Sequence, residues 1–184
     1  MPENKVTYGE QLSIGLNKTS NDCSQDVQGF NCGDPAFNEW IADDAANPGC
    51  VSLCFTNQEN GELIAYASIA CSSVQVSVPG GFLNSRPAVE VRLFAVSADY
   101  QHMPFFDDPS HPEYTLSVFL FFYLLTYITE LAESKVGAEL VVLNSVPRAY
   151  TFYKNKIGFS DLEEDMQIAP SLQTDGCKSM YRFI

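Results

Sequence analysis

The stretch GAELVVLNSVPRAYTFYKNKIGF (residues 137–159) determines how we interpret the rest of the chain. Its first part, AELVVLNS, is a continuous apolar run, which is typical of a strand buried on both faces of a sheet. Pro147 then begins PRAYTFYKNK, and proline is well tolerated at the first position of a helix. The stretch therefore predicts a buried strand followed at once by a short helix.

A second strand and helix precede this stretch. The run VEVRLFAV (89–96) predicts a strand, and residues 115–135 predict a helix that is apolar nearly all round in its first three turns. Such a helix lies deep in a core. The junction between them, DYQHMPFFDDPSHPEYTLS (99–117), has three prolines, several acids and no glycine. It is unlike the glycine-rich phosphate loops that many cofactor-binding folds place between a strand and a helix.

The first half of the chain predicts a strand, a helix and a hairpin. Asp34 can cap a helix over DPAFNEWIADDAAN (34–47), with Pro35 at its first position. The turn residues NQENG separate two strand-like runs, which is the sequence pattern of a β-hairpin. We expect strands at LSIGLNK (12–18), VSLCFT (51–56) and ELIAYASIA (62–70), a loop at SVPGGFLNSRP (77–87), and two weaker strands at MQIAP (166–170) and SMYRFI (179–184).

This order of elements predicts the fold class. Hairpins in the first half and a strand–helix–strand–helix unit in the second half indicate an α/β (α+β) fold with a mixed sheet covered by helices. We expect six to seven strands, mostly antiparallel. At 184 residues the chain has the length of one ordinary domain, so we predict a single domain over residues 1–184.

The composition limits which cellular location and which binding partners we expect. With 10 Lys and Arg against 23 Asp and Glu, the formal net charge is −13, which repels nucleic acid and anionic membranes at long range. The N-terminus has no signal-peptide pattern, and the apolar run at 118–128 is shorter than the roughly 20 residues of a membrane span. We therefore predict a soluble, cytoplasmic protein with no nucleic-acid or membrane partner.

The cysteines predict thiols rather than a metal site. No CxxC pair occurs, and His102 and His111 are the two histidines, so the sequence offers little to bind zinc. Without an export signal, reduced thiols are expected, although a disulfide between Cys23 and Cys32 or between Cys50 and Cys54 stays open. The six cysteines are Cys23, Cys32, Cys50, Cys54, Cys71 and Cys177.

Residues 88–159 resemble the core of the GNAT superfamily of acyl-CoA-dependent N-acyltransferases. VEVRLFAVSADYQ is similar to the fourth strand of the family and the turn after it. GAELVVLNSVPRAYTFYKNKIGF is similar to its fifth strand and closing helix, which commonly ends in FY, a few residues, then GF. FNCGDPAFNEWIADDA and NGELIAYASIA resemble the helix and hairpin of the branch that includes toxin acetyltransferases. Together these stretches cover about four fifths of the chain.

The resemblance implies a binding site for acetyl-CoA and no metal. In the family the fourth and fifth strands separate, and the pantetheine arm pairs with exposed backbone of the fourth strand, as in β-augmentation. By this resemblance, the main-chain contacts of the family correspond to Phe94, Ala95 and Val96. A main-chain N–H near Phe94 would polarise the thioester carbonyl. The same three residues could instead be ordinary core residues of a strand.

The pyrophosphate loop of the family departs from its pattern here. Gln101 matches the first position of Q/R-x-x-G-x-G/A, but His102 and the four residues after it replace the glycines, which elsewhere let the backbone approach phosphate closely. In one interpretation the loop bulges out and the helix still binds phosphate near Thr115 or Ser117, with His102 as a further donor. In the other, the cofactor site is weakened or lost and the loop covers it or meets a protein partner.

Tyr153 falls on the closing-helix tyrosine that the family uses to protonate the departing thiolate. A phenol is protonated at neutral pH and can act as this acid without tuning. Tyr153 also shares an apolar helix face with Ala149, Phe152 and Ile157. It could therefore be a packing residue without a catalytic role. Asn144 is a candidate cofactor contact, although many relatives carry this asparagine at the position of Val146. KNKIGF is one residue longer between Tyr153 and Gly158 than the usual form.

Glu90 is the candidate general base, since the histone-acetylating branch of the superfamily carries a glutamate at this place. A carboxylate on a central strand is costly to bury unless it is used or paired. Arg92, two residues on, lies on the same strand face and could pair with Glu90 in a structural role.

The resemblance therefore implies an N-acetyltransferase that transfers an acetyl group from acetyl-CoA to a primary amine. An acidic protein suits a small amine, a polyamine, or a lysine or N-terminus of a protein, whereas the net charge opposes aminoacyl-tRNA as acceptor. A homodimer is compatible with the apolar content. The alternative is a catalytically silent GNAT-like module that acts through protein partners.

Overall fold

The computed structural model describes residues 14–18, 27–105, 114–168 and 176–184. Contacts divide the chain into two compact units: unit 1 comprises Met1–Ser68 and Leu93–Phe121, and unit 2 comprises Ile69–Arg92 and Phe122–Ile184. The predicted single domain remains a prediction. The elements are β1 (Ile14–Lys18), α2 (Pro35–Ala45), β2 (Val51–Asn57), β3 (Leu63–Val78), β4 (Phe82–Val96), η1 (Ala98–Tyr100), α3 (Leu116–Leu131), η2 (Ala132–Val136), β5 (Leu140–Ser145), η3 (Pro147–Ala149), η4 (Phe152–Ile157), β6 (Ser160–Asp161), β7 (Met166–Ile168) and β8 (Lys178–Phe183).

The strands form a mixed, mostly antiparallel sheet, as predicted. Its order is β1-β2-β3-β4-β5-β8-β6, and β7 pairs with β3 beside this path. The β4–β5 pair is parallel, with Ala88–Val91 opposite Leu140–Leu143, whereas β5 pairs with β8 in antiparallel fashion. A parallel pair needs a long crossover, which the helix α3 supplies. The fold class expected from the order of elements is confirmed.

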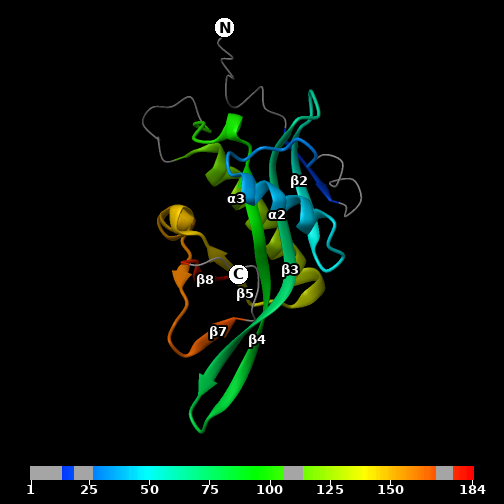
Figure 1. Ribbon diagram of the computed structural model, residues 1–184. Helices are drawn as coiled ribbons and strands as arrows, with labels where there is room; N and C mark the ends of the chain where they lie inside the picture. Colours follow the sequence, from blue (N-terminus) through cyan, green and yellow to red (C-terminus); the bar gives the residue numbers. More distant parts are fainter. Residues whose placement is uncertain (1–13, 19–26, 106–113, 169–175) are drawn as a thin grey trace. The chain divides into compact units, whose positions relative to one another are not determined.

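Residues 77–87 correct one prediction, because they form a hairpin instead of a loop. The strands β3 and β4 run through this stretch and meet at a turn in which Gly81 donates to the carbonyl of Val78 over 3.3 Å. Pro79 fixes the second turn position, and Gly80 has φ 97°, which is the arrangement of a type II turn. Figure 1 shows the two strands as a long ribbon that ends in this turn, with β7 beside β3.

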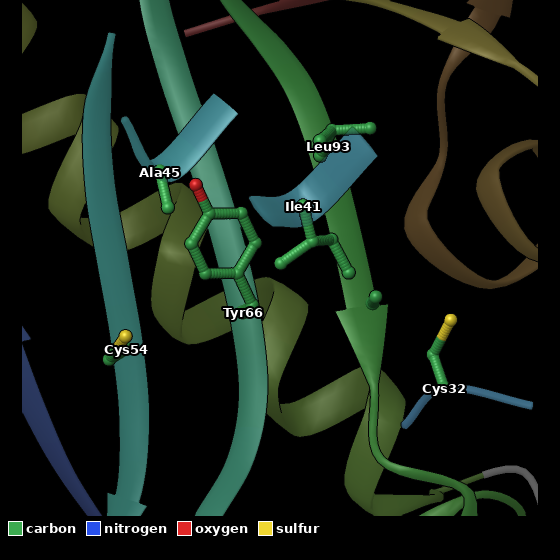
Figure 2. Close-up of a cluster of buried hydrophobic side chains, with 7 residues drawn as sticks. Cys32, Ile41, Ala45, Cys54, Tyr66 and Leu93 are labelled. Atoms are coloured by element: carbon green, nitrogen blue, oxygen red, sulfur yellow. The ribbon is translucent and has the colours of Figure 1, made fainter. Parts of the chain in front are cut away.

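The core of unit 1 lies between α2 and the strands β2, β3 and β4. Buried side chains of α2, Ile41 and Ala45, pack with Cys54, Tyr66 and Leu93. Figure 2 shows the ring of Tyr66 among these side chains, between the helix and the strands. Alternating strand residues supply this face, as a two-residue period requires.

A buried polar group joins α2 to β3 in the same unit. Asp44 is 3% exposed and accepts hydrogen bonds from Ser68 Oγ and, at 3.7 Å, from Cys50 Sγ. Tyr66 and Ser52 share a hydroxyl hydrogen bond of 2.9 Å. These bonds offset the cost of burying polar groups in the core.

Unit 2 has its own core, formed by β3, β4, β5 and β8. Val74, Ala88, Leu140, Val142 and Tyr181 are its buried members. Its strand β5 is buried along nearly its whole length, as the apolar run AELVVLNS predicted. The five described cysteines are free thiols, whereas Cys23 lies outside the described residues.

The long helical stretch Leu116–Val136 could cross a membrane by length and composition alone, with a mean hydropathy of 1.4. A core helix of a soluble protein meets the same criteria, and 44% of an 18-residue window in this stretch is buried in the protein. Leu120, Leu124 and Ile128 are fully buried, which is what the sequence predicted for a core helix.

We expect Asp34→Ala to destabilise the protein by about 1 kcal/mol. Asp34 Oδ1 accepts the N–H groups of Ala36 and Phe37 at 3.1 and 3.3 Å, and alanine leaves these donors of the first turn without their cap. Urea unfolding measures the loss. Asp43→Ala, on the exposed side of the same helix, is the control, and an equal loss in both variants would contradict the capping role.

A second prediction concerns Tyr100, which donates to Glu62 Oε2 over 2.7 Å. Burial, and then this hydrogen bond, raises the pKa of Tyr100 to about 12. Because the unfolded phenol titrates near 10, its contribution to stability is complete below pH ~10 and is lost as pH rises toward 12. Stability should therefore fall less steeply over this range in Tyr100→Phe than in wild type.

Urea unfolding midpoints at about pH 8, 10 and 12 measure this difference. Tyr123→Phe, at an exposed site, is the control and should keep the wild-type slope. Parallel alkaline losses in wild type and Tyr100→Phe would show that Tyr100 does not carry the effect.

Candidate functional site

The last residues of β4 lie beyond its parallel ladder with β5. That ladder ends at Val91 and Leu143, while β4 continues to Val96. Ala95 is buried with the core of unit 1, and the ring of Phe94 contacts the ring of Phe121 edge-on at 4.9 Å. The side chains of this segment therefore pack on both faces of the sheet. Its main chain is the part that a cofactor could pair with.

Gln101 and His102 follow η1 in unit 1. The side-chain amide nitrogen of Gln101 donates to the carbonyls of Cys32 and Val96, both at 2.8 Å. It ties the segment before α2 to the end of β4. His102 is exposed and has φ 62°, so it adopts the left-handed conformation that usually favours glycine.

The segment after His102 packs against the start of α3. Leu116 N–H donates to the carbonyl of Met103 over 2.8 Å, and Phe105 N–H donates to the carbonyl of Tyr114 over 2.7 Å. Pro104 and Thr115 form an antiparallel bridge, and the ring of Phe105 stacks on that of Phe119 at 4.0 Å. Residues 106–113, which include Phe106 and three of the four acids of this junction, lie outside the described residues.

Thr115 and Ser117 lie at the start of α3, where backbone N–H groups already have hydrogen-bond acceptors within the chain. Thr115 Oγ1 accepts the N–H of Val118 at 3.4 Å, and Ser117 is half-buried in the first turn. The Met103 carbonyl takes up the N–H of Leu116, which belongs to the set of amides that a phosphate would use at a helix N-terminus.

Glu90 and Asn144 are placed in unit 2. Glu90 is 6% exposed and lies opposite Val142 of β5 in the parallel ladder. Glu90 and Arg92 both take part in polar or electrostatic contacts. Asn144, near the end of β5, accepts a hydrogen bond from Ser179 Oγ over 2.7 Å.

Tyr153 lies in η4, a turn of π-helix that follows the short η3. Gly158 and Phe159 both donate to the carbonyl of Tyr153, so the helix closes over five and six residues instead of four. A π-turn accommodates one extra residue in a helix, which explains how KNKIGF carries its additional residue. The Tyr153 side chain is 8% exposed and packs on Phe152 and Phe159.

Burial raises the pKa of Tyr153 well above its ordinary value. The phenol is therefore protonated throughout the neutral range, where it can donate a proton and cannot act as a base. The raised pKa keeps the proton on the phenol, and it also makes this phenol a weaker proton donor than an exposed tyrosine.

The candidate residues divide between the two units. Unit 1 holds Phe94, Ala95, Val96, Gln101, His102, Thr115 and Ser117, whereas unit 2 holds Glu90, Asn144 and Tyr153. The side chain of Gln101 and the carbonyl of Val96 are joined directly by a hydrogen bond. In the part of the chain that the structure describes, no group of three or more His, Cys, Asp or Glu could hold a metal.

Two features were missed at the sequence level. One is the contact of Met103 and Phe105 with α3, which depends on main-chain atoms that sequence does not specify. The other is an exposed cluster in unit 2, in which Lys154 and Lys178 lie 5.2 and 4.9 Å from the ring centre of Tyr150. The spacing of Tyr150 and Lys154, four residues apart on one helix face, is a signal that could have found half of it.

No protein-family model matches the chain, and comparison with curated protein sequences gives no match. Solved structures do match over most of its length. A bacterial toxin has 17% identity and a TM-score of 0.64, covering 94% of this chain and 91% of its own. AtaTR bound with AcCoA has 15% identity and a TM-score of 0.65, covering 92% and 93%. AtaT complexed with acetyl-methionyl-tRNAfMet has 18% identity and a TM-score of 0.61, covering 86% and 95%.

These structures overturn the expectation that nucleic acid is excluded as a partner. AtaT is solved with a tRNA, and a KacTA–DNA complex is similar to this chain with a TM-score of 0.59 and 14% identity. The expectation treated the charge as uniform. Unit 1 carries 2 basic and 14 acidic residues, a net −12, whereas unit 2 carries 8 basic and 9 acidic residues, a net −1. A nucleic acid responds to the local field, which the net charge of the whole chain does not describe.

The likeness extends over 86–94% of this chain in the three structures given above. AtaT and KacT are GNAT-fold acetyltransferases. The chain therefore has the fold of the GNAT superfamily, as the resemblance of its sequence predicted.

Proposed function

We propose that this chain is an N-acetyltransferase that transfers the acetyl group of acetyl-CoA to the amine of an aminoacyl-tRNA. The observation that carries the proposal is the position of Tyr153, a buried phenol in the closing helical turn of a GNAT fold. AtaTR bound with AcCoA and AtaT complexed with acetyl-methionyl-tRNAfMet support the two substrates. AtaT and KacT have also been solved with a tyrosine replaced by phenylalanine.

The chemistry needs one acid and one base. The amine nitrogen attacks the thioester carbonyl, so a C–N bond forms and the C–S bond breaks. The departing thiolate takes the phenol proton of Tyr153, and the amine loses one proton to Glu90 directly or through water. Glu90 is the candidate base because a carboxylate buried on a central strand is costly unless it is used or paired.

The main chain at Phe94–Val96 supplies the contacts to the pantetheine arm, since this part of β4 extends past its ladder with β5. A donor near Phe94 polarises the thioester carbonyl. Gln101, His102, Thr115, Ser117 and Asn144 are proposed around the rest of the cofactor. Because the amide of Gln101 already holds two carbonyls, we assign it a positioning role at the end of β4.

The distribution of charge supports a tRNA as the acceptor. Unit 2 contains eight of the ten basic residues, and exposed Lys154 and Lys178 lie beside the Tyr150 ring. Lysine side chains bind phosphates without reading sequence, and aromatic rings stack with bases. Asp161 accepts hydrogen bonds from both Tyr150 and Lys154, which holds them in place. A cytoplasmic location fits this substrate and is part of the proposal.

A second candidate function is a catalytically silent binding module. It is favoured by the hydrogen bond from Leu116 N–H to the Met103 carbonyl, which occupies a phosphate-binding position. This alternative predicts no acetyl transfer.

We expect Tyr153→Phe to lower the rate of acetyl transfer about 100-fold or more, because positioned general acids contribute on the order of 10²–10⁴. Phenylalanine keeps the packing on Phe152 and Phe159. The assay follows radiolabelled acetyl from acetyl-CoA to aminoacylated tRNA, with deacylated tRNA as the substrate control. Tyr127→Phe removes a phenol from α3 and should keep the wild-type rate.

Different results would contradict the assigned acid, the assigned acceptor and the enzymatic activity itself. Wild-type rates in Tyr153→Phe would remove the assigned acid. Equal labelling of deacylated tRNA would exclude the amino acid as the acceptor. Saturable acetyl-CoA binding without transfer to any aminoacyl-tRNA would favour the binding module.

A further inference from the structure

Met103, Pro104 and Phe105 contact the start of α3, the place to which the proposed function assigns the pyrophosphate of the cofactor, and we call these three residues the plug. The carbonyl of Met103 accepts the first N–H of the helix, and the Phe105 ring stacks on Phe119 in its first turn. The two rings are 10° from parallel. The plug therefore satisfies by an internal contact what a phosphate satisfies in other proteins.

The two acceptors compete for one donor. Leu116 N–H points at the Met103 carbonyl at 2.8 Å, and a hydrogen bond of this length is directional. A phosphate oxygen could receive this N–H only after the carbonyl has left. The ring of Phe105, stacked on Phe119, holds the plug against the first turn of the helix.

Contacts on both sides hold the plug in place. Upstream, Gln101 is held by the carbonyls of Cys32 and Val96. His102 then turns the chain at φ 62°, a conformation that is costly for a residue with a Cβ. Downstream, the bridge to Thr115 and the ring stack hold the plug to α3. A change at His102 would move the plug and leave the end of β4 in place.

We propose that the plug is an autoinhibitory element, which must leave the start of α3 before a diphosphate-bearing cofactor can bind. This inference rests on the proposed function, because it assumes that acetyl-CoA is the cofactor. It reconciles a GNAT fold with a loop that lacks glycine. The closed plug keeps the cofactor affinity low, and any factor that releases Phe105 raises it.

The first test compares the affinity of wild type and Phe105→Ala for coenzyme A and for pantetheine, which lacks the diphosphate. Loss of the ring stack should tighten coenzyme A binding roughly threefold to tenfold in calorimetry and lower Tm, with pantetheine affinity unchanged. Phe37→Ala breaks another aromatic pair of unit 1, with Trp40 at 5.2 Å. This control should lower Tm without changing the affinity for either ligand.

The second test locks the plug with the double variant Pro104→Cys, Thr115→Cys. Bridge partners lie at a spacing that a disulfide can span. The oxidised variant should bind coenzyme A more weakly than the same variant after reduction. Both states carry the Thr115→Cys change, so the loss of a proposed cofactor contact cancels in this comparison. Wild type carried through the same oxidation controls for the native cysteines.

The outcomes distinguish the plug from the proposed function. Equal or weaker coenzyme A binding by Phe105→Ala, or undiminished binding by the oxidised double variant, overturns the plug alone. If wild type, Phe105→Ala and the reduced double variant bind neither coenzyme A nor pantetheine, the proposed function falls, and the plug falls with it.

Discussion

The parallel pairing of β4 with β5 is the constraint on which the rest of the fold depends. Two parallel strands cannot be joined by a tight turn, so the chain must leave the sheet and return through α3. On β4 the ladder covers only Ala88–Val91, whereas the strand itself continues to Val96. The same constraint thus produces a buried crossover helix, a junction that leads into it, and a stretch of β4 whose main chain extends past β5.

The sequence predicted those features that follow from hydrophobic pattern and capping. The Asp34 cap, the apolar crossover helix and the buried strand β5 all match the structure. The hairpin at residues 77–87 was missed because Pro-Gly-Gly is typical of loops. Here the two central turn residues, Pro79 and Gly80, are enough to connect two long strands. The additional residue between Tyr153 and Gly158 indicated that the end of this helix is altered. Only the backbone hydrogen bonds show that a π-turn accommodates it.

The net charge led to the wrong prediction about nucleic acid. Net charge predicts long-range behaviour only when the charges are spread evenly, and here unit 1 holds nearly the whole excess of acids. Within unit 2 the acids and bases nearly balance, and Lys154 and Lys178 converge on one aromatic ring. A count for each predicted element would have kept a nucleic-acid acceptor open, because the basic residues concentrate after residue 134.

The junction between β4 and α3 shows why motif matching is incomplete at a binding site. Glycine matters in a phosphate loop because it lets backbone donors meet the ligand, and the physical requirement is an accessible donor. In this chain the donor is present as Leu116 N–H, but a carbonyl of the same chain accepts it. In the mechanism that we propose, loss of the glycines does not by itself remove the site, because an internal and an external acceptor compete for this donor. The contacts of Phe105 then determine how that competition is balanced.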